Sequence, residues 1–221
     1  MNITYWSDFN CPYSYIGLKR LSDATKEVGL DFKWRFKAFE LDPTLSDEPS
    51  KSMIKHHMDK FHLPKQDAIK DIDEINSIAA KSGLDINYSN VKVVSSKNAH
   101  RLVKYITTIK ENVLQELVFK IFEYNFTLNQ NIADIEVLCE IAQKFGFEKS
   151  EICEMLMSET YTVEVELDTE DAMLNGISAI PHYIISVNDD ELIIPGAFEK
   201  DDFKIALKDL SSGEIRKKTF I

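Results

Sequence analysis

Alternating apolar and polar positions mark two short strands near the start of the chain, with one helical segment between them. Residues 2–8 form the first expected strand, and residues 32–39 (FKWRFKAF) alternate cleanly, which is typical of a strand with one buried face. Residues 12–28 carry apolar side chains at helical spacing, and Gly29 follows as a C-terminal cap. A strand–helix–strand order of this kind makes the two strands parallel neighbours in one sheet.

Helical periodicity replaces this alternation through the middle of the chain. Residues 41–50 are turn-like, and from residue 51 to about residue 176 the pattern is that of successive helices, interrupted by an irregular or extended stretch at 85–94. The helices are expected at residues 51–61, from Pro64 to about Gly83, and at 96–109, 114–122, 134–145, 150–157 and 159–174.

The last quarter returns to strands and closes with a helix. Residues 180–187 are apolar and β-branched, residues 188–190 predict a turn, and residues 191–195 supply the partner strand of a hairpin. A helix is expected over residues 199–210, and the basic tail at 216–218 is expected to be solvated. Neither group of strands closes a sheet alone, so the helical block must be inserted within one α/β domain.

Composition and charge exclude several classes of function. The 221 residues are 44% hydrophobic and 29% charged, which is enough to bury a core, and no run approaches the roughly 20 apolar residues of a membrane span. A net charge of −11 without a Lys/Arg cluster argues against nucleic-acid binding. The first residues lack the basic and apolar regions of a signal peptide. We therefore expect a cytoplasmic protein that binds neither nucleic acid nor membrane.

Three cysteines, Cys11, Cys139 and Cys153, are too few and too dispersed for a disulfide framework. The odd count predicts reduced thiols in a reducing compartment. Apolar neighbours place Cys139 and Cys153 in packed helices, and a role for either as the resolving partner of Cys11 is the less favoured interpretation.

The histidines do not predict a metal site. His56, His57 and His62 lie close in sequence, but no cysteine or helical histidine pair at ligand spacing joins them. We expect them to lie on a solvated helix.

Candidate chemistry centres on Cys11, where the first strand gives way to the first helix. Pro12 fits the first helical position, because its missing N–H costs nothing there. Cys11 would then lie at a helix N-terminus, where unpaired N–H groups and the helix dipole favour a thiolate, the nucleophilic form. The competing interpretation is a buried cysteine that packs as a small hydrophobic residue.

Four stretches resemble the DsbA family of thioredoxin-like proteins, and within it the branch of FrnE-like proteins and 2-hydroxychromene-2-carboxylate isomerases. The resemblance covers nearly the whole chain, and its most specific parts are residues 8–17 (DFNCPYSYIG), 98–102 (NAHRL), 176–181 (GISAIP) and 194–197 (IPGA).

This resemblance implies an α/β thioredoxin fold with a large all-helical insertion. The whole chain, residues 1–221, would be a single DsbA-like domain. Its thioredoxin-like part would comprise residues 1–45 and 176–221, and its helical insertion residues 46–175.

The family's active-site motif maps onto four consecutive residues. Cys11 matches the nucleophilic cysteine, and Pro12 and Tyr13 continue the motif at the helix start. Ser14 stands where redox-active members have a resolving cysteine, so the motif reads CPYS. Ser14 would either donate its hydroxyl hydrogen bond to the Cys11 thiolate or bond locally as a first-turn residue, and both interpretations stay open.

Further candidates come from the same resemblance. Pro181 matches the cis-proline that faces the active site, and backbone groups there and at the preceding Ile180 bind peptide or thiol substrates in the family. His100 would line the groove or lie on a helix surface, and the surface position is favoured. His182 would touch substrate or point into the helical insertion.

The implied function is that of a cytoplasmic thiol–disulfide oxidoreductase or isomerase with a single active-site cysteine. Its partners would be protein or small-molecule thiols and disulfides. No tightly bound cofactor is expected, but glutathione or another low-molecular-weight thiol would resolve the mixed disulfide as co-substrate. The oligomeric state stays open, with a homodimer as one option.

Two alternatives remain. One is a glutathione-dependent isomerase or transferase of the 2-hydroxychromene-2-carboxylate isomerase or kappa-class type, acting on a small aromatic compound. The other is a redox-inactive binding scaffold. A closed apolar pocket would favour the isomerase, whereas an open groove beside Ile180 and Pro181 would favour protein disulfides as substrates.

Overall fold

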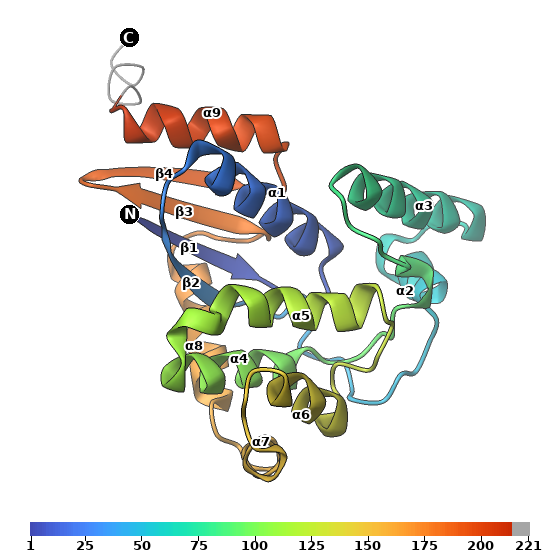
Figure 1. Cartoon of the computed structure of the whole chain (residues 1–221). Helices are drawn as coiled ribbons and strands as arrows, with labels where there is room; N and C mark the ends of the chain where they lie inside the picture. Colours follow the sequence, from blue (N-terminus) through green and yellow to red (C-terminus); the bar gives the residue numbers. More distant parts are fainter. Residues whose placement is uncertain (214–221) are drawn as a thin grey trace.

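A computed structural model describes residues 1–213, so the basic tail at 216–218 lies outside the described residues. Its strands form one mixed sheet in the order β2-β1-β3-β4 (Figure 1). The predicted parallel pairing of β1 and β2 is confirmed, and β3 pairs antiparallel with both β1 and β4. The strands are β1 (Asn2–Ser7), β2 (Lys33–Ala38), β3 (His182–Val187) and β4 (Asp190–Pro195).

The helices lie close to their predicted positions. The stretch expected to be irregular contains a short 3₁₀ turn, η1 (Tyr88–Asn90), and a second, η2 (Glu111–Val113), precedes α5. The α-helices are α1 (Pro12–Val28), α2 (Met53–Phe61), α3 (Lys65–Lys81), α4 (Lys97–Ile109), α5 (Leu114–Phe126), α6 (Ile135–Gln143), α7 (Lys149–Met157), α8 (Thr162–Leu174) and α9 (Lys200–Ser211).

One face of the sheet is covered by α1 and α9, which pack side by side (Figure 1). The apolar positions that alternate along the strands face this layer. Tyr5 on β1 is opposite Tyr183 on β3, and their stacked rings lie 6.3 Å apart. Both side chains are fully buried, so the alternation read from the sequence does define the core.

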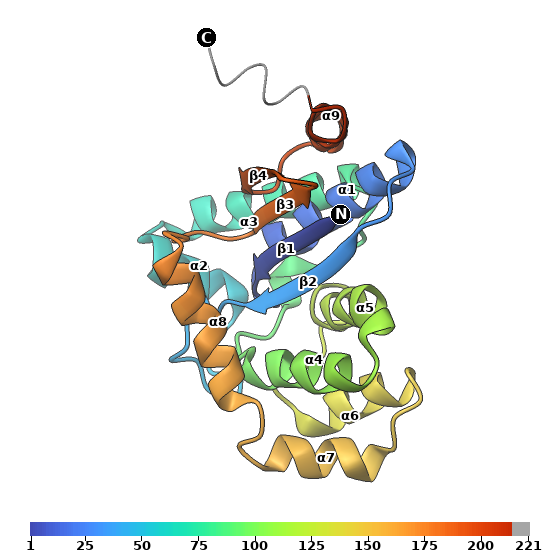
Figure 2. The ribbon, with the colours of Figure 1, turned by 90° about the vertical axis from the view of Figure 1, so that its left-hand side faces the viewer.

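The other face is covered by α8, which docks part of the helical block directly on the sheet (Figure 2). The buried Asp168 of α8 accepts a hydrogen bond from the Ala38 amide at 2.8 Å and pairs with Lys37 of β2 at 3.0 Å. The indole N–H of Trp6 donates to the Asp168 carbonyl at 3.2 Å. The helical block and the sheet are therefore parts of one folded unit.

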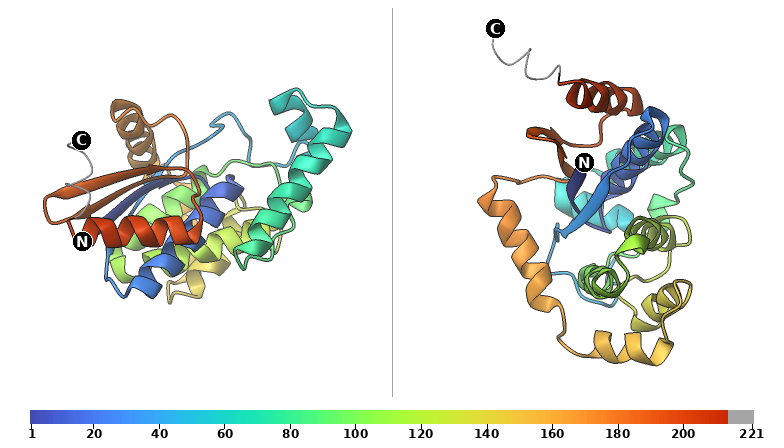
Figure 3. Two further views of the ribbon diagram at one scale, coloured as in Figure 1. Left: turned by 90° about the horizontal axis from the view of Figure 1, so that it is seen from above. Right: turned by 60° about the vertical axis from the view of Figure 1, so that its left-hand side comes forward.

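The α2–α3 pair projects beyond the end of the sheet at which β1 ends and α1 begins (Figure 3). Of the two helices, α3 packs against α1. Within residues 1–213, no helix combines the length and apolar composition that crossing a membrane requires.

Cys139 of α6 and Cys153 of α7 form a disulfide, with Cα atoms 6.0 Å apart. The expectation of three reduced thiols is therefore wrong, and Cys11 is the free cysteine. The two helices are neighbours in space, a relation that the spacing of the cysteines along the chain does not reveal.

Gly17 should be required for the close packing of α1 on the sheet. A Cβ there would lie 2.5 Å from the Tyr183 hydroxyl oxygen and 3.1 Å from Ala197, so Gly17→Ala should lower the free energy of unfolding by about 1–3 kcal/mol. Denaturant unfolding would measure this cost. In a Tyr183→Phe background the added methyl loses its closest contact, and an undiminished cost there would contradict the explanation.

The disulfide should be detectable by counting reactive cysteines in the unfolded chain. Alkylation in denaturant without reductant should modify one cysteine, and after reduction it should modify all three. Since the bridge closes a loop with a sequence separation of 14, Cys153→Ala should cost about 3 kcal/mol of stability. Three modified cysteines before reduction would disprove the pairing.

Candidate functional site

The candidate site is built on the turn that connects β1 to α1. The Cys11 amide donates to the Asp8 carbonyl at 3.0 Å, which closes the turn. The Asp8 carboxylate accepts hydrogen bonds from the Asn10 amide at 3.0 Å and from the Leu41 amide at 2.7 Å. One buried carboxylate thus fixes both the turn that carries Cys11 and the loop after β2.

Two side-chain amides tie the same turn to neighbouring parts of the chain. Asn125 of α5, which is fully buried, donates to the Phe9 carbonyl at 2.8 Å. Asn10 donates to the Val94 carbonyl, in the segment before α4, also at 2.8 Å. The position of Cys11 therefore depends on the helical block as well as on the sheet.

Cys11 occupies the N-cap of α1, with Pro12 at the first helical position, as predicted. Its side chain is only 5% exposed. Burial raises the pKa of the Cys11 thiol above its ordinary value of 9.0, and the charge of Asp8 raises it further, whereas the neighbouring Ser14 hydroxyl lowers it in part. The expectation of a stabilised thiolate is thus wrong for this closed geometry, in which desolvation dominates.

Ser14 is buried at the second position after Pro12. Its amide donates to the Cys11 carbonyl at 3.1 Å, as in any first helical turn. Its hydroxyl is buried beside Cys11, where it lowers the pKa of the thiol.

His100 was expected on a helix surface, and the structure shows instead that it is fully buried. Its Nε2 lies 3.5 Å from the Asp8 carboxylate, and its ring packs against Phe9 and Phe36. Burial by itself would raise the pKa of Asp8, but His100, together with the hydrogen bonds to Ser96 and the Leu41 amide, holds that pKa below its ordinary value. His100 therefore contacts the carboxylate that holds the turn carrying Cys11.

Arg101, the residue after His100 in the 98–102 motif, has a structural role of its own. It is buried, and its guanidinium donates to carbonyl oxygens at the C-terminal end of α7 and just beyond it, including those of Leu156 and Thr160. Cations at a helix C-terminus are favourable because the last carbonyl groups are unpaired. This motif thus has two structural roles, one toward Asp8 and one toward α7.

A cavity of about 140 Å³ lies against Cys11. Its walls come from the start of α1, the loop after β2, α2, α3, η1 and the segment that follows η1, and they are mostly apolar. The lining side chains include Asn10, Cys11, Tyr13, Leu41, Leu45, Met53, His56, His57, Lys60, Phe61, Ile75, Tyr88 and Val93.

His57 lies in this cavity and not on a solvated surface, which corrects the expectation for the histidine group. It is 4% exposed, whereas His62 is exposed and His56 is half-buried. The His57 Nε2 lies 3.3 Å from the Tyr88 hydroxyl oxygen. The short α2 has too few apolar positions to reveal which of its faces is covered, so the sequence did not single out His57. Among residues 1–213, no group of three or more potential ligands could hold a metal ion.

Ile180, Pro181 and His182 are not among the residues that line the cavity, and Pro181 is buried while the other two are half-buried. The Ile180–Pro181 peptide bond is cis, and the Pro181 carbonyl accepts from the Gly196 amide at 2.7 Å. His182 is opposite Trp6 on β1, and their rings lie 6.1 Å apart. In the antiparallel pairing of β1 with β3, Pro181 comes one residue before His182 and therefore lies near the end of β1. The chain continues from that end of β1 to Cys11. Ile180 forms no backbone hydrogen bond with the described residues.

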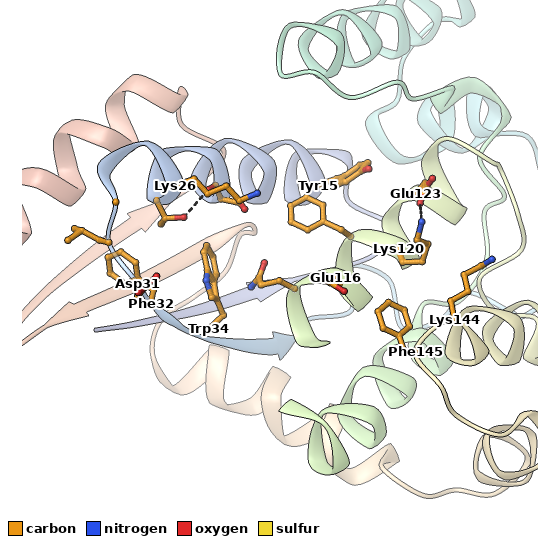
Figure 4. A pocket seen from close by; sticks show the side chains of 16 residues that line it. Tyr15, Lys26, Asp31, Phe32, Trp34, Glu116, Lys120, Glu123, Lys144 and Phe145 are labelled. Atoms are coloured by element: carbon orange, nitrogen blue, oxygen red, sulfur yellow. Dashed lines mark hydrogen bonds and ion pairs between the residues drawn. The ribbon is translucent and has the colours of Figure 1, made fainter. Parts of the chain in front are cut away.

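A larger cavity, of about 950 Å³, lies between α1, β2 and α5, away from Cys11 (Figure 4). Tyr15 and Trp34 face it from α1 and β2, and Lys144 and Phe145 lie on its far side. Its lining contains no cysteine or histidine. It therefore contains no thiol, whereas Cys11 lines the smaller cavity.

Comparison with known proteins adds a family match over nearly the whole chain. Residues 2–208 match the DSBA-like thioredoxin domain. The uncharacterized protein YwbO of Bacillus subtilis is 26% identical over 215 residues, which cover 95% of this chain and 96% of that protein. The probable DsbA oxidoreductase SCO1869 of Streptomyces coelicolor superposes with a TM-score of 0.84 at 23% identity, covering 97% of this chain and 91% of that one.

Two further solved structures share the fold. The cytosolic disulfide reductase DsbM of Pseudomonas aeruginosa, solved with GSH, has a TM-score of 0.66 at 15% identity, covering 94% of this chain and 98% of that one. A 2-hydroxychromene-2-carboxylate isomerase has a TM-score of 0.64 at 16% identity, covering 99% of this chain and 98% of that one. These likenesses establish the thioredoxin-like DsbA fold.

The Asp8 carboxylate should stabilise the fold in a pH-dependent way. Because its folded pKa is lowered, its contribution is present above the unfolded value of 3.8 and is lost as pH falls through the folded pKa. Asp8→Asn should therefore lower the free energy of unfolding at pH 7 by about 1–3 kcal/mol, with the difference shrinking below about pH 4. Denaturant unfolding at both pH values measures it. The exposed Asp73→Asn is the control, and an equal loss at both pH values would contradict the assignment.

Proposed function

The chain belongs to the DSBA-like thioredoxin domain family, and on that premise we propose that it is a thiol–disulfide oxidoreductase or isomerase acting through the single sulfur of Cys11. The observation that carries this proposal is the placement of Cys11. It is the free cysteine, it caps the first helix after β1, and it borders a cavity suited to a small group.

The proposed reaction begins when the Cys11 sulfur attacks one sulfur of a disulfide. A bond forms between Cys11 Sγ and that sulfur, the substrate S–S bond breaks, and its electron pair leaves on the second sulfur, which takes up the proton lost by Cys11. Ser14 offers no second sulfur, and Cys139 and Cys153 are bonded to each other. An outside thiol therefore has to release the mixed disulfide. Two outside thiols reduce the substrate, whereas a thiol of the substrate itself isomerises it.

The small size of the cavity favours a small group of the substrate beside Cys11. A dry cavity of roughly 150 Å³ holds one benzene ring, so about 140 Å³ accommodates a cysteine-sized group or a single ring. Low-molecular-weight thiols and their disulfides present such a group. The structure of DsbM solved with GSH supports glutathione, or a thiol of the same class, as the co-substrate.

A cytoplasmic location is part of the proposal. The cytosolic DsbM with the same fold supports it. The sequence argument from three reduced thiols no longer does, since Cys139 and Cys153 are paired and structural disulfides are rare in the cytosol of mesophiles.

A thiol-dependent isomerase of a small aromatic compound is the second candidate. The mostly apolar lining of the cavity favours it, and Ile180 and Pro181 are absent from that lining. In that case glutathione would bind beside Cys11 without forming a lasting disulfide. Non-covalent binding of reduced glutathione, with no adduct from the oxidised form, would select this candidate.

Cys11 should form a mixed disulfide that accumulates. Incubation with oxidised glutathione, followed by intact-mass measurement without reductant, should show one glutathione per chain, because no nearby thiol displaces it. Cys11→Ser should give no adduct.

Ser14→Cys is the matched variant. It restores a second sulfur one helical turn away, so the adduct should be replaced by an internal disulfide. Absence of an adduct on the wild-type protein, or an adduct that persists in Cys11→Ser, would overturn the proposal.

A further inference from the structure

His57 and Tyr88 form a buried polar pair in the otherwise mostly apolar cavity beside Cys11. His57 Nε2 lies 3.3 Å from the Tyr88 hydroxyl oxygen, and both side chains are at most 5% exposed. The other ring nitrogen of His57, Nδ1, is buried without a hydrogen-bond partner among the described residues. A buried donor or acceptor without a partner lowers the stability of the fold by about 1–3 kcal/mol. A contribution to stability alone therefore does not explain why a histidine lies at this position.

The pair also lies close to the thiol. Cys11, His57 and Tyr88 line the same cavity of about 140 Å³, so a sulfur bound there shares the cavity with the imidazole and the phenol. Cys11 is near enough for its negative charge to contribute to the raised pKa of Tyr88, after the larger effect of burial. The phenol consequently keeps its proton and serves as an O–H group.

We propose that His57 is the proton acceptor and donor for thiol exchange at Cys11, with the Tyr88 hydroxyl passing the proton between the sulfur and the imidazole. This inference rests on the proposed function and adds to it two residues that line the same cavity as Cys11.

The proton balance follows the sulfur exchange. As Cys11 Sγ bonds to the substrate sulfur, its proton moves to the Tyr88 oxygen while the Tyr88 proton moves to His57 Nε2. The substrate S–S bond breaks, its electron pair goes to the leaving sulfur, and His57 returns one proton through Tyr88 to that sulfur. The disulfide is the oxidant and becomes the mixed disulfide plus one free thiol, so no further reactant is needed.

The surroundings of His57 keep it neutral at pH 7, as a base must be. Burial lowers the pKa of His57 below 6.5, the charge of Asp71 on α3 opposes this shift, and Lys60 on α2 adds to it. The remaining titratable groups that line the cavity are Asp42 in the loop after β2, His56 on the same helix, Tyr88 on η1, and Cys11 and Tyr13 at the start of α1.

The pH dependence of adduct formation tests the assignment. The rate of the reaction with oxidised glutathione, followed by intact mass from pH 5 to pH 9, should fall on the acid side as His57 becomes protonated below pH 6.5. In His57→Gln this inflection should disappear, and the rate at pH 7 should drop on the order of 100-fold, because it then depends on the small thiolate fraction of Cys11.

Tyr88→Phe keeps the ring and removes only the hydroxyl, so it tests the relay even where His57→Gln disturbs the fold. It should show the same loss of rate and of the inflection, and the double variant should lose no more than either single one. His62→Asn, at an exposed position of positive φ (54°) just after the same helix, is the control and should match the wild type.

The outcomes separate the two proposals. A wild-type protein that forms no adduct at any pH overturns the proposed function and the relay together. A wild-type protein that reacts, with His57→Gln or Tyr88→Phe retaining its rate and acid-side inflection, overturns the relay alone. Loss of rate with the inflection unchanged assigns the pair to packing and likewise overturns the relay.

Discussion

The hydrogen bonds around the Asp8 carboxylate determine where the reactive sulfur lies. The carboxylate accepts from the Asn10 and Leu41 amides, so the turn before α1 and the loop after β2 share one acceptor. Asn125 holds the same turn from the helical block. Cys11 is thus positioned by contacts from both parts of the chain, and the helical insertion is a component of the site as well as a cover for it.

Burial decides the chemistry of that sulfur. A helix N-terminus stabilises an anion by about 0.3–1 kcal/mol, up to about 2 in favourable geometry, which is at most about 1.5 pKa units. Desolvation of a fully buried group shifts a pKa by as much as 3–5 units. At Cys11 the larger effect wins and the resting form is the protonated thiol. A nearby proton acceptor then becomes a requirement of the reaction, and His57 with Tyr88 meets it.

Local patterns in the sequence predicted what depends on local physics. The bounds of α1, with Pro12 first and Gly29 as cap, follow from backbone constraints within a few residues, and the parallel pairing of β1 with β2 follows from chain connectivity. The errors concern relations between distant elements. Burial of His100 requires Asp8, ninety-two positions earlier, and the Cys139–Cys153 bridge requires two helices to be neighbours. The spacing of apolar residues within one helix indicates neither the burial of His100 nor the pairing of the two cysteines.

The ionisation of Cys11 is the property on which this account depends most directly. Because Cys11 is the free cysteine when the other two are paired, the difference in ultraviolet absorbance between the native protein and its Cys11→Ser variant during an alkaline titration reports on the Cys11 thiolate, since the eight tyrosines ionise in both. The burial of Cys11 predicts a pKa above the ordinary value of 9.0. A thiolate already formed at neutral pH would show that the helix N-terminus outweighs desolvation and would contradict the account.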